Sequence, residues 1–128
     1  MRVISTLFAL VLLAFSTAFA SDGDVTLAGR VVLRIRYPAA GYTIAERADA
    51  VQIRLNEVLG MGPIQPEDVK IKRVNKETAI VVKDQLIITV DWTTARANKT
   101  TPEKLGQIWA ANLRSALPEV IPRGVNHL

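Results

Sequence analysis

The residue types that most often carry out acid–base or nucleophilic chemistry are scarce in this chain. It contains no cysteine and a single histidine, His127, which is the next-to-last residue. After residue 20 the only serines are Ser21 and Ser115, and Ser115 falls within a predicted helix. A Ser–His–acid arrangement needs a nucleophile and a base within hydrogen-bond distance, and these positions do not provide one. We therefore expect no catalytic residues and no enzymatic activity.

Metal and cofactor sites are not predicted either. The chain has no cysteine, no pair of histidines and no Asp-rich loop with the spacing of a calcium site. The Gly-Met-Gly run at 60–62 follows a predicted helix instead of opening one, and it lacks the lysine of a phosphate-binding loop. Three carboxylates, Asp49, Asp84 and Asp91, have no predicted position relative to one another. They leave a small hydrolase as a minor alternative.

The first twenty residues have the three-part pattern of a secretory signal peptide. Arg2 gives a positive start, residues 3–15 form an apolar run, and small residues occupy the Ala-x-Ala positions that follow. The apolar run is shorter than the roughly 20 residues that a membrane-spanning helix needs. We expect cleavage between Ala20 and Ser21 and a periplasmic or secreted protein, with retention of the leader as an anchor left as the alternative.

Removal of this leader changes the composition on which the fold depends. Of the 128 residues 108 remain, enough for one domain, and they carry a net charge of +3 from 15 basic and 12 acidic residues. All three phenylalanines lie in the leader, so the remaining aromatic residues are two tyrosines and two tryptophans. We predict a polar lead-in at 21–30, a single domain at 31–118 and a flexible C-terminal tail at 119–128.

Apolar periodicity predicts six secondary-structure elements in this domain. In the first strand, Val31, Leu33, Ile35 and Tyr37 alternate with more polar residues and are expected to face the core. The third of the later strands is nearly all apolar and is expected to be the central one. In chain order the elements are a strand at 31–37, a helix at 44–59 capped by Thr43 and Glu46, strands at 69–74, 79–83 and 86–91, a loop at 93–100, and a helix capped by Thr100 or Thr101.

The order β-α-β-β-β-α predicts an α+β fold, a two-layer sandwich with a mainly antiparallel four-stranded sheet and two helices on one face. The place of the first strand in the sheet is left open. The other face of the sheet would carry Arg34, Arg36, Lys70 and Lys72, which could bind an anionic lipid headgroup or an acidic glycan. The alternative is a solvated face whose long side chains cover the sheet. Nucleic acid is not expected as a partner, because this face lacks aromatic side chains for base stacking.

The two tryptophans have different expected roles. Trp92 follows the last predicted strand, where it either anchors a loop in the core or is an exposed contact residue. Trp109 lies on the apolar side of the last predicted helix and is expected in the core. In the first helix, by contrast, Arg47 and Arg54 fall on the side that faces solvent.

A series of short motifs resembles a known family. They are Ala28-Gly29 before the first strand, Glu46-Arg47-Ala48 and Arg54-Leu55 in the first helix, Thr89-Val90 followed by Asp91, and Thr101-Pro102-Glu103 followed by Trp109-Ala110 in the last helix. Over roughly 28–117 the chain resembles the extracytoplasmic N-terminal domain of bacterial small-conductance mechanosensitive-channel-like proteins. It departs at Leu105-Gly106, where Leu-Ala is expected. The resemblance implies an exported sensory or interaction domain, and no channel follows by residue 128, so we expect a stand-alone form.

These observations favour an exported, non-enzymatic interaction module that associates with an envelope or membrane protein, such as a mechanosensitive channel. The alternative is a binder of an anionic envelope ligand that uses the four cations of the sheet face. Under either hypothesis Trp92 is a candidate contact residue.

Overall fold

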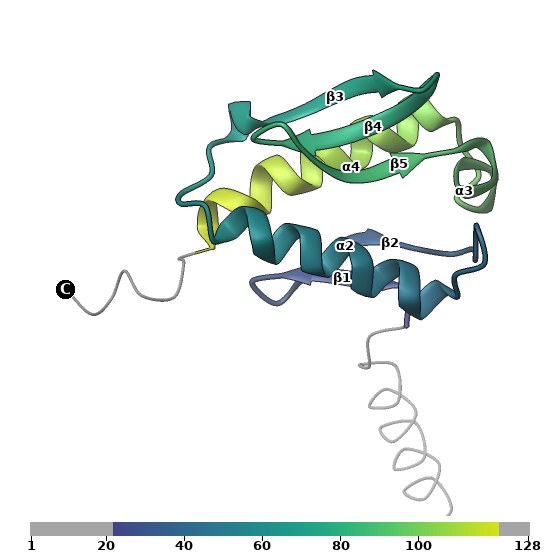
Figure 1. Ribbon diagram of the computed structural model, residues 1–128, viewed down its shortest axis with the longest axis horizontal. Helices are drawn as coiled ribbons and strands as arrows, with labels where there is room; N and C mark the ends of the chain where they lie inside the picture. Colours follow the sequence, from purple (N-terminus) through teal and green to yellow (C-terminus); the bar gives the residue numbers. More distant parts are fainter. Residues whose placement is uncertain (1–21, 121–128) are drawn as a thin grey trace, which may run out of the picture.

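The computed structural model describes residues 22–120, so the predicted leader, its cleavage site and His127 lie outside the described residues (Figure 1). None of the helices in this range is long and apolar enough to cross a membrane. The elements in chain order are β1 (Asp24–Leu27), β2 (Arg30–Arg34), α2 (Ile44–Leu59), η1 (Pro66–Asp68), β3 (Val69–Val74), β4 (Glu77–Val82), β5 (Gln85–Val90), α3 (Trp92–Ala97), α4 (Pro102–Ala116) and η2 (Leu117–Glu119).

The predicted α+β class is confirmed, but the strands form two antiparallel sheets instead of one four-stranded sheet. β1 and β2 pair with each other, and β3, β4 and β5 form the second sheet in that order. The sequence interpretation missed β1, which lies inside the predicted polar lead-in. Val25 and Leu27 are buried, and the positive φ angles of Ala28 and Gly29 (50° and 77°) close a tight hairpin. β1 therefore supplies the hydrogen-bonding partner that β2 was expected to find in the larger sheet.

The faces of β2 also differ from the simple alternation that was predicted. The strand ends at Arg34, and Val32 and Leu33 are both buried, whereas Val31 is 42% exposed. The pairing with β1 shifts register between Val25 and Thr26, which breaks the strict period of two.

The second sheet consists of two hairpins joined by two-residue turns. The turn residues Asn75 and Lys76 have φ angles of 49° and 67°, and Lys83 and Asp84 have 50° and 65°. Positive φ at both central residues is the geometry of a type I′ turn. The central strand is β4, with five buried residues, and the apolar strand β5 is at an edge. The expectation that β5 is central is wrong: among the described strands β5 pairs with β4 alone, and α2 and α4 pack against it.

The helices begin where their capping residues predicted. Thr43 and Glu46 form a complete capping box at the start of α2, and the Thr101 hydroxyl accepts a hydrogen bond from the Lys104 backbone N–H at the start of α4. The predicted loop at 93–100 instead contains α3, whose first turn is capped by Asp91.

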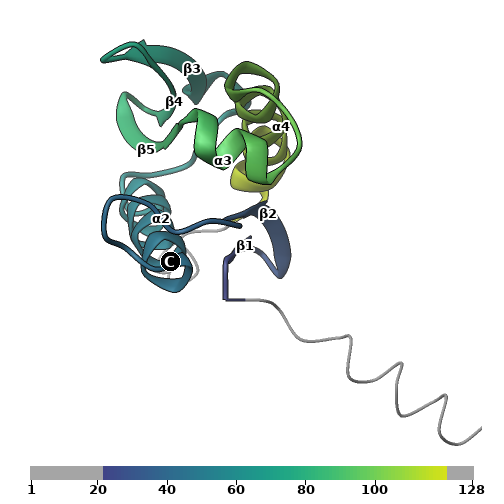
Figure 2. The ribbon, with the colours of Figure 1, turned by 90° about the vertical axis from the view of Figure 1, so that its right-hand side faces the viewer.

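Only one of the two long helices covers a face of the larger sheet. α4 packs on β3 and β4 and also reaches β2, whereas α2 lies along the edge strand β5 and against β1 (Figures 1 and 2). One continuous core fills the space between the two sheets and both helices. Its largest fully buried side chains include Ile35, Leu55, Ile80, Ile87, Leu113 and Leu117.

Candidate functional site

The basic face predicted from the sequence is not formed, because β2 does not belong to the sheet of β3. Arg34 and Arg36 therefore lie apart from Lys70 and Lys72. The Arg34 Nε donates to Asp24 Oδ1 over 2.6 Å, and the Arg36 Nε donates to an oxygen of the Asn98 side chain. Both guanidinium groups thus serve contacts within the domain.

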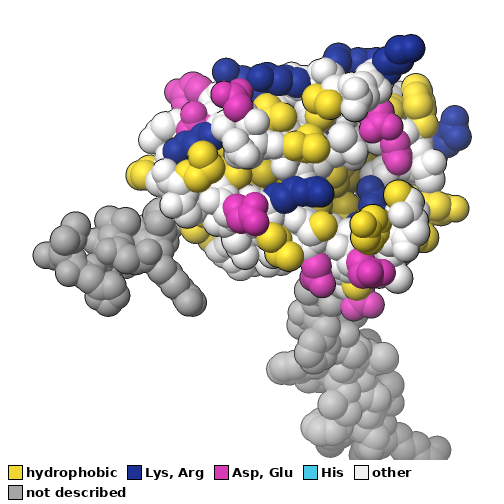
Figure 3. Space-filling model, viewed as in Figure 1, with side chains coloured by type: hydrophobic (Ala, Val, Ile, Leu, Met, Phe, Trp, Pro, Cys, Tyr) yellow, Lys and Arg dark blue, Asp and Glu magenta, His cyan; other side chains and the backbone are white. Residues whose placement is uncertain are grey.

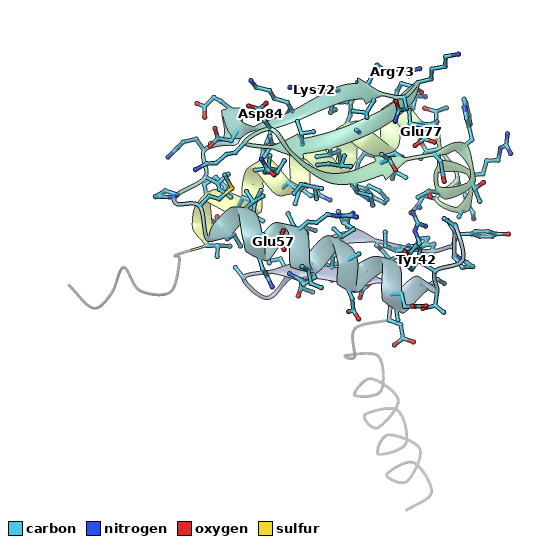
Figure 4. The ribbon with its side chains drawn as sticks, viewed as in Figure 1. Tyr42, Glu57, Lys72, Arg73, Glu77 and Asp84 are labelled. Atoms are coloured by element: carbon cyan, nitrogen blue, oxygen red, sulfur yellow. The ribbon has the colours of Figure 1, made fainter. Side chains whose placement is uncertain are left out.

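The two lysines of β3 do lie on one exposed strand, as predicted. Lys72 Nζ is 3.2 Å from Asp84 Oδ1 in the turn between β4 and β5, and Figure 4 shows these two labelled side chains close together. Lysines on an edge strand oppose its pairing with other strands, which is a structural reason for their presence.

Aromatic side chains are exposed at the end of the molecule formed by α3 and by the loop before α2. The domain's aromatic residues within 22–120 are Tyr37, Tyr42, Trp92 and Trp109. Trp109 is buried as predicted, but Tyr37, Tyr42 and Trp92 are 48%, 59% and 55% exposed. For Trp92 the structure therefore selects the exposed alternative. Figure 2 looks onto this end and shows α3 in front, beside the loop that leads into α2.

Polar contacts hold this aromatic end in one arrangement. Arg47 of α2 donates to the Tyr37 carbonyl oxygen over 2.6 Å and to the Thr94 hydroxyl of α3 over 3.4 Å. The Arg96 guanidinium lies 5.7 Å from the centre of the Trp92 ring, which is a cation–π distance. These contacts tie the loop, α2 and α3 together, so the exposed rings are presented on a fixed frame.

A cleft of about 430 Å³ adjoins this end, between α2 and the edge strand β5. In Figure 3, Lys and Arg side chains lie beside a hollow in the middle of the face, between the sheet and α2. Figure 4 labels Tyr42, from the loop before α2, and Glu77, from β4, which line opposite sides of the cleft. The charged residues that line it are Glu46, Arg47, Arg54, Glu77 and Asp91.

Two of the carboxylates that line the cleft, Glu46 and Asp91, serve as caps of helices. Hydrogen bonds from the Thr43 backbone N–H and then from its hydroxyl hold the pKa of Glu46 below its usual value of 4.5. A general acid needs the opposite shift. Asp91 accepts a hydrogen bond from the Thr94 backbone N–H over 2.7 Å as the cap of α3. Asp49 and Asp84 do not line this cleft. Within residues 22–120, no group of three metal-ligating side chains is assembled.

The sequence interpretation missed the cleft because its walls come from distant segments. Arg47 and Arg54 were placed correctly on the polar side of α2, and Glu77 was part of a polar break between strands. Their proximity depends on α2 lying along β5, which no local pattern indicates. A central position for β5, as predicted, would have left no room for the cleft.

Comparison with protein families assigns most of the described chain. The family model of a domain of unknown function (DUF8459) matches residues 24–120. The chain belongs to the DUF8459 family. The match begins at the first residue of β1, so the hairpin that the sequence interpretation left in the lead-in is part of the family domain. No curated protein and no solved structure matches the chain.

Proposed function

We propose that this protein is an exported, non-enzymatic module that binds another protein of the cell envelope through its aromatic end. Export is supported by the signal-peptide pattern of residues 1–20. A partner in or near the membrane, such as a mechanosensitive channel, is suggested by the sequence resemblance at 28–117.

The observation that carries the proposal is the exposure of Tyr37, Tyr42 and Trp92 at one end. Exposed aromatic rings leave apolar area in water, and such clusters mark interaction surfaces more often than scattered single residues do. Tyrosine, tryptophan and arginine are also the residues that dominate binding energy at protein interfaces. Because Arg47 and Arg96 fix the surrounding frame, a partner would bind a surface that loses little conformational entropy.

Two further hypotheses receive less support. Binding of an anionic lipid headgroup or acidic glycan depended on four cations on one face, and the structure separates Arg34 and Arg36 from Lys70 and Lys72. The small hydrolase depended on Asp49, Asp84 or Asp91 meeting in a cleft. Of these three only Asp91 lines the cleft, and it serves as the cap of α3.

Site-specific photocrosslinking in intact cells tests the proposal. A photoreactive phenylalanine analogue replaces Trp92 or Tyr42 in one pair of strains and Ile53, which is 57% exposed on α2, in a matched control. We expect one envelope protein to be joined from positions 92 and 42 and not from position 53. Trp92→Ala should then weaken its binding by about thirtyfold or more, as for an interface hot spot.

Adducts that are the same from all three positions would contradict the proposal, since they would show no preference for the aromatic end. The absence of any adduct from positions 92 and 42 would also contradict it. The thermal transition of Trp92→Ala serves as the control for folding, and we expect it to match that of the parent because the ring is exposed.

A further inference from the structure

The direction of the backbone groups in β4 follows from the turn that precedes it. Asn75 and Lys76 form a two-residue turn with positive φ at both positions, and Val74 pairs with Glu77 across it. The residues that flank such a turn exchange both backbone hydrogen bonds. The N–H and C=O groups of Glu77 therefore point toward β3. Because successive residues of a strand direct their backbone groups to opposite sides, the N–H and C=O groups of Thr78 and Ile80 point toward β5.

The same alternation leaves backbone groups of β5 directed at the open edge of the sheet. Ile88 and Val90 pair with Ile80 and Thr78, so the N–H and C=O groups of Thr89 point away from β4. Ile87 supports this direction, because its carbonyl oxygen accepts a hydrogen bond from Arg54 Nη1 of α2 over 3.1 Å. Within residues 22–120, no strand, helix or turn supplies a backbone partner to Thr89 on that side.

The cleft lies along this open edge. Thr89 lines one wall, and Ala50 and Val51 of α2 line the other, so the middle of the cleft has small side chains. The extended chain from Ile87 to Asp91, which includes the end of β5 and the cap of α3, spans roughly 13 Å at about 3.3 Å per residue. The volume of about 430 Å³ is in the range of clefts that hold a ligand. An exposed edge strand is the feature to which an extended peptide adds as a further strand.

The two ends of the cleft differ in charge: Arg54 lies at one end, and carboxylates outnumber the one arginine, Arg47, at the other. Arg54 lies at the end near Ile87, and it uses one N–H for the Ile87 carbonyl oxygen out of the five that a guanidinium carries. Among the described residues it forms no ion pair with a carboxylate. Glu77 and Asp91 lie at the other end, beside the Thr78–Val90 pair.

We infer that the cleft binds an extended segment of a partner protein, which adds to β5 as a further strand. The backbone of the segment pairs with Thr89, an acidic residue of the segment meets Arg54, and a basic residue meets Glu77 and Asp91. This inference rests on the proposed function as a protein-interaction module, and it names a second contact, next to the aromatic end.

A displayed library of random heptapeptides provides the test, with a blocked cleft as the counter-selection. Ala50→Trp places a large ring in the cleft, whereas Ala45→Trp places the same ring on an exposed part of α2 outside it. We expect to select peptides that bind both the parent and Ala45→Trp but do not bind Ala50→Trp. The selected peptides should carry one acidic and one basic residue near opposite ends. The inference is wrong if no peptide is retained by the parent over Ala50→Trp although both show the same thermal transition.

The enriched peptide then reports on the backbone pairing. N-methylation of its alternate residues should weaken binding by about tenfold or more for one set of residues and leave it unchanged for the other, since a strand faces its neighbour with every second residue. Bound peptide should shift the NMR signal of the Thr89 amide and slow its hydrogen exchange. Equal effects of both methylated sets, or shifts confined to β1, β2 or β3, would overturn the inference.

The outcomes separate this inference from the proposed function. An envelope partner crosslinked from Trp92, together with no peptide selected by the cleft, would leave the proposed function standing and refute strand addition. Peptides that bind at Thr89, together with no adduct from Trp92 in cells, would refute the aromatic end as the contact surface and retain the cleft.

Discussion

Truncation of Leu55 tests the packing of α2, on which both candidate surfaces depend. Leu55 is 0% exposed and belongs to the core cluster that also contains Val51 and Val58 of the same helix. Leucine-to-alanine changes in protein cores cost about 2.7–5.0 kcal/mol, and the cost rises with the cavity that remains. With no exposed area at this position we expect a loss in the upper half of that range, about 4 kcal/mol. A domain of this size has a total stability on the order of 5–15 kcal/mol, so the effect is large.

The assay is thermal unfolding followed by circular dichroism, with Ile53→Ala as the matched control on the same helix. Each kcal/mol lowers the midpoint of a 60–100-residue domain by about 4–8 °C, so Leu55→Ala should lose about 15–30 °C. Ile53 is 57% exposed, and its replacement should change the unfolding free energy by less than about 0.5 kcal/mol. Similar midpoints for the two variants, or a loss of under about 1 kcal/mol for Leu55→Ala, would refute the assigned inward side of α2.

Two further predictions concern the packing of α4 and the cap of α2. A Cβ atom added at Gly106 would lie 3.1 Å from the Thr78 Cγ2 atom, so Gly106→Ala should destabilise the domain by about 0.5–1 kcal/mol in urea denaturation despite its better helix propensity. Thr78→Ser removes that methyl group, so the double variant should be more stable than the sum of the single changes predicts, and strictly additive effects would contradict the contact. The hydrogen bonds from Thr43 lower the pKa of Glu46, so ionised Glu46 stabilises the fold above its usual value of 4.5, and this contribution is lost as the pH falls through the lowered pKa. The unfolding midpoint should therefore fall further between about pH 6 and about pH 3 for the parent than for Glu46→Gln. Equal falls for the two proteins would show that protonation of Glu46 does not affect the stability of the fold.

The two long helices were the most predictable part of the fold, because their signals are local. Capping residues and the 3.6-residue period place both ends of α2 and the start of α4 without any knowledge of neighbouring elements. The 3.6-residue period did not predict the burial of every helical residue, however. Ile108 is apolar and precedes the buried Trp109, but it is 53% exposed. A stripe only indicates which side of a helix is apolar, whereas the extent of the neighbouring strands decides how far it is covered.

The three later strands were located well but arranged wrongly, for a physical reason. β3, β4 and β5 lie within one or two residues of the predicted runs, but strand order depends on contacts between segments distant in sequence. β1 has only four residues and begins with a charged one, so its two buried positions, Val25 and Leu27, were too few to stand out from a polar lead-in. The apolar alternation of a four-residue strand can be recognised only when its pairing partner is known.

The candidate site was less predictable than the fold, since its parts acquire a role only through exposure or proximity. Trp92 was named as a candidate contact from its position after a strand, and its exposure agrees with that choice. Neither Tyr42 nor Glu77 falls within a sequence motif, and together with Arg54 they form a site only because α2 lies along β5.

The division into two sheets is the feature that links these surfaces. Had β2 joined the larger sheet beside β5, its backbone would have paired with Thr89 and its side chains would have filled the cleft. Because β1 pairs with β2 instead, β5 remains an edge strand and α2 lies along it, with a hydrogen bond from Arg54 to the Ile87 carbonyl oxygen. The same placement brings the loop before α2 next to α3, where Arg47 donates to both the Tyr37 carbonyl oxygen and the Thr94 hydroxyl. A change that joined β2 to β5 would therefore remove the cleft and dismantle the aromatic end together.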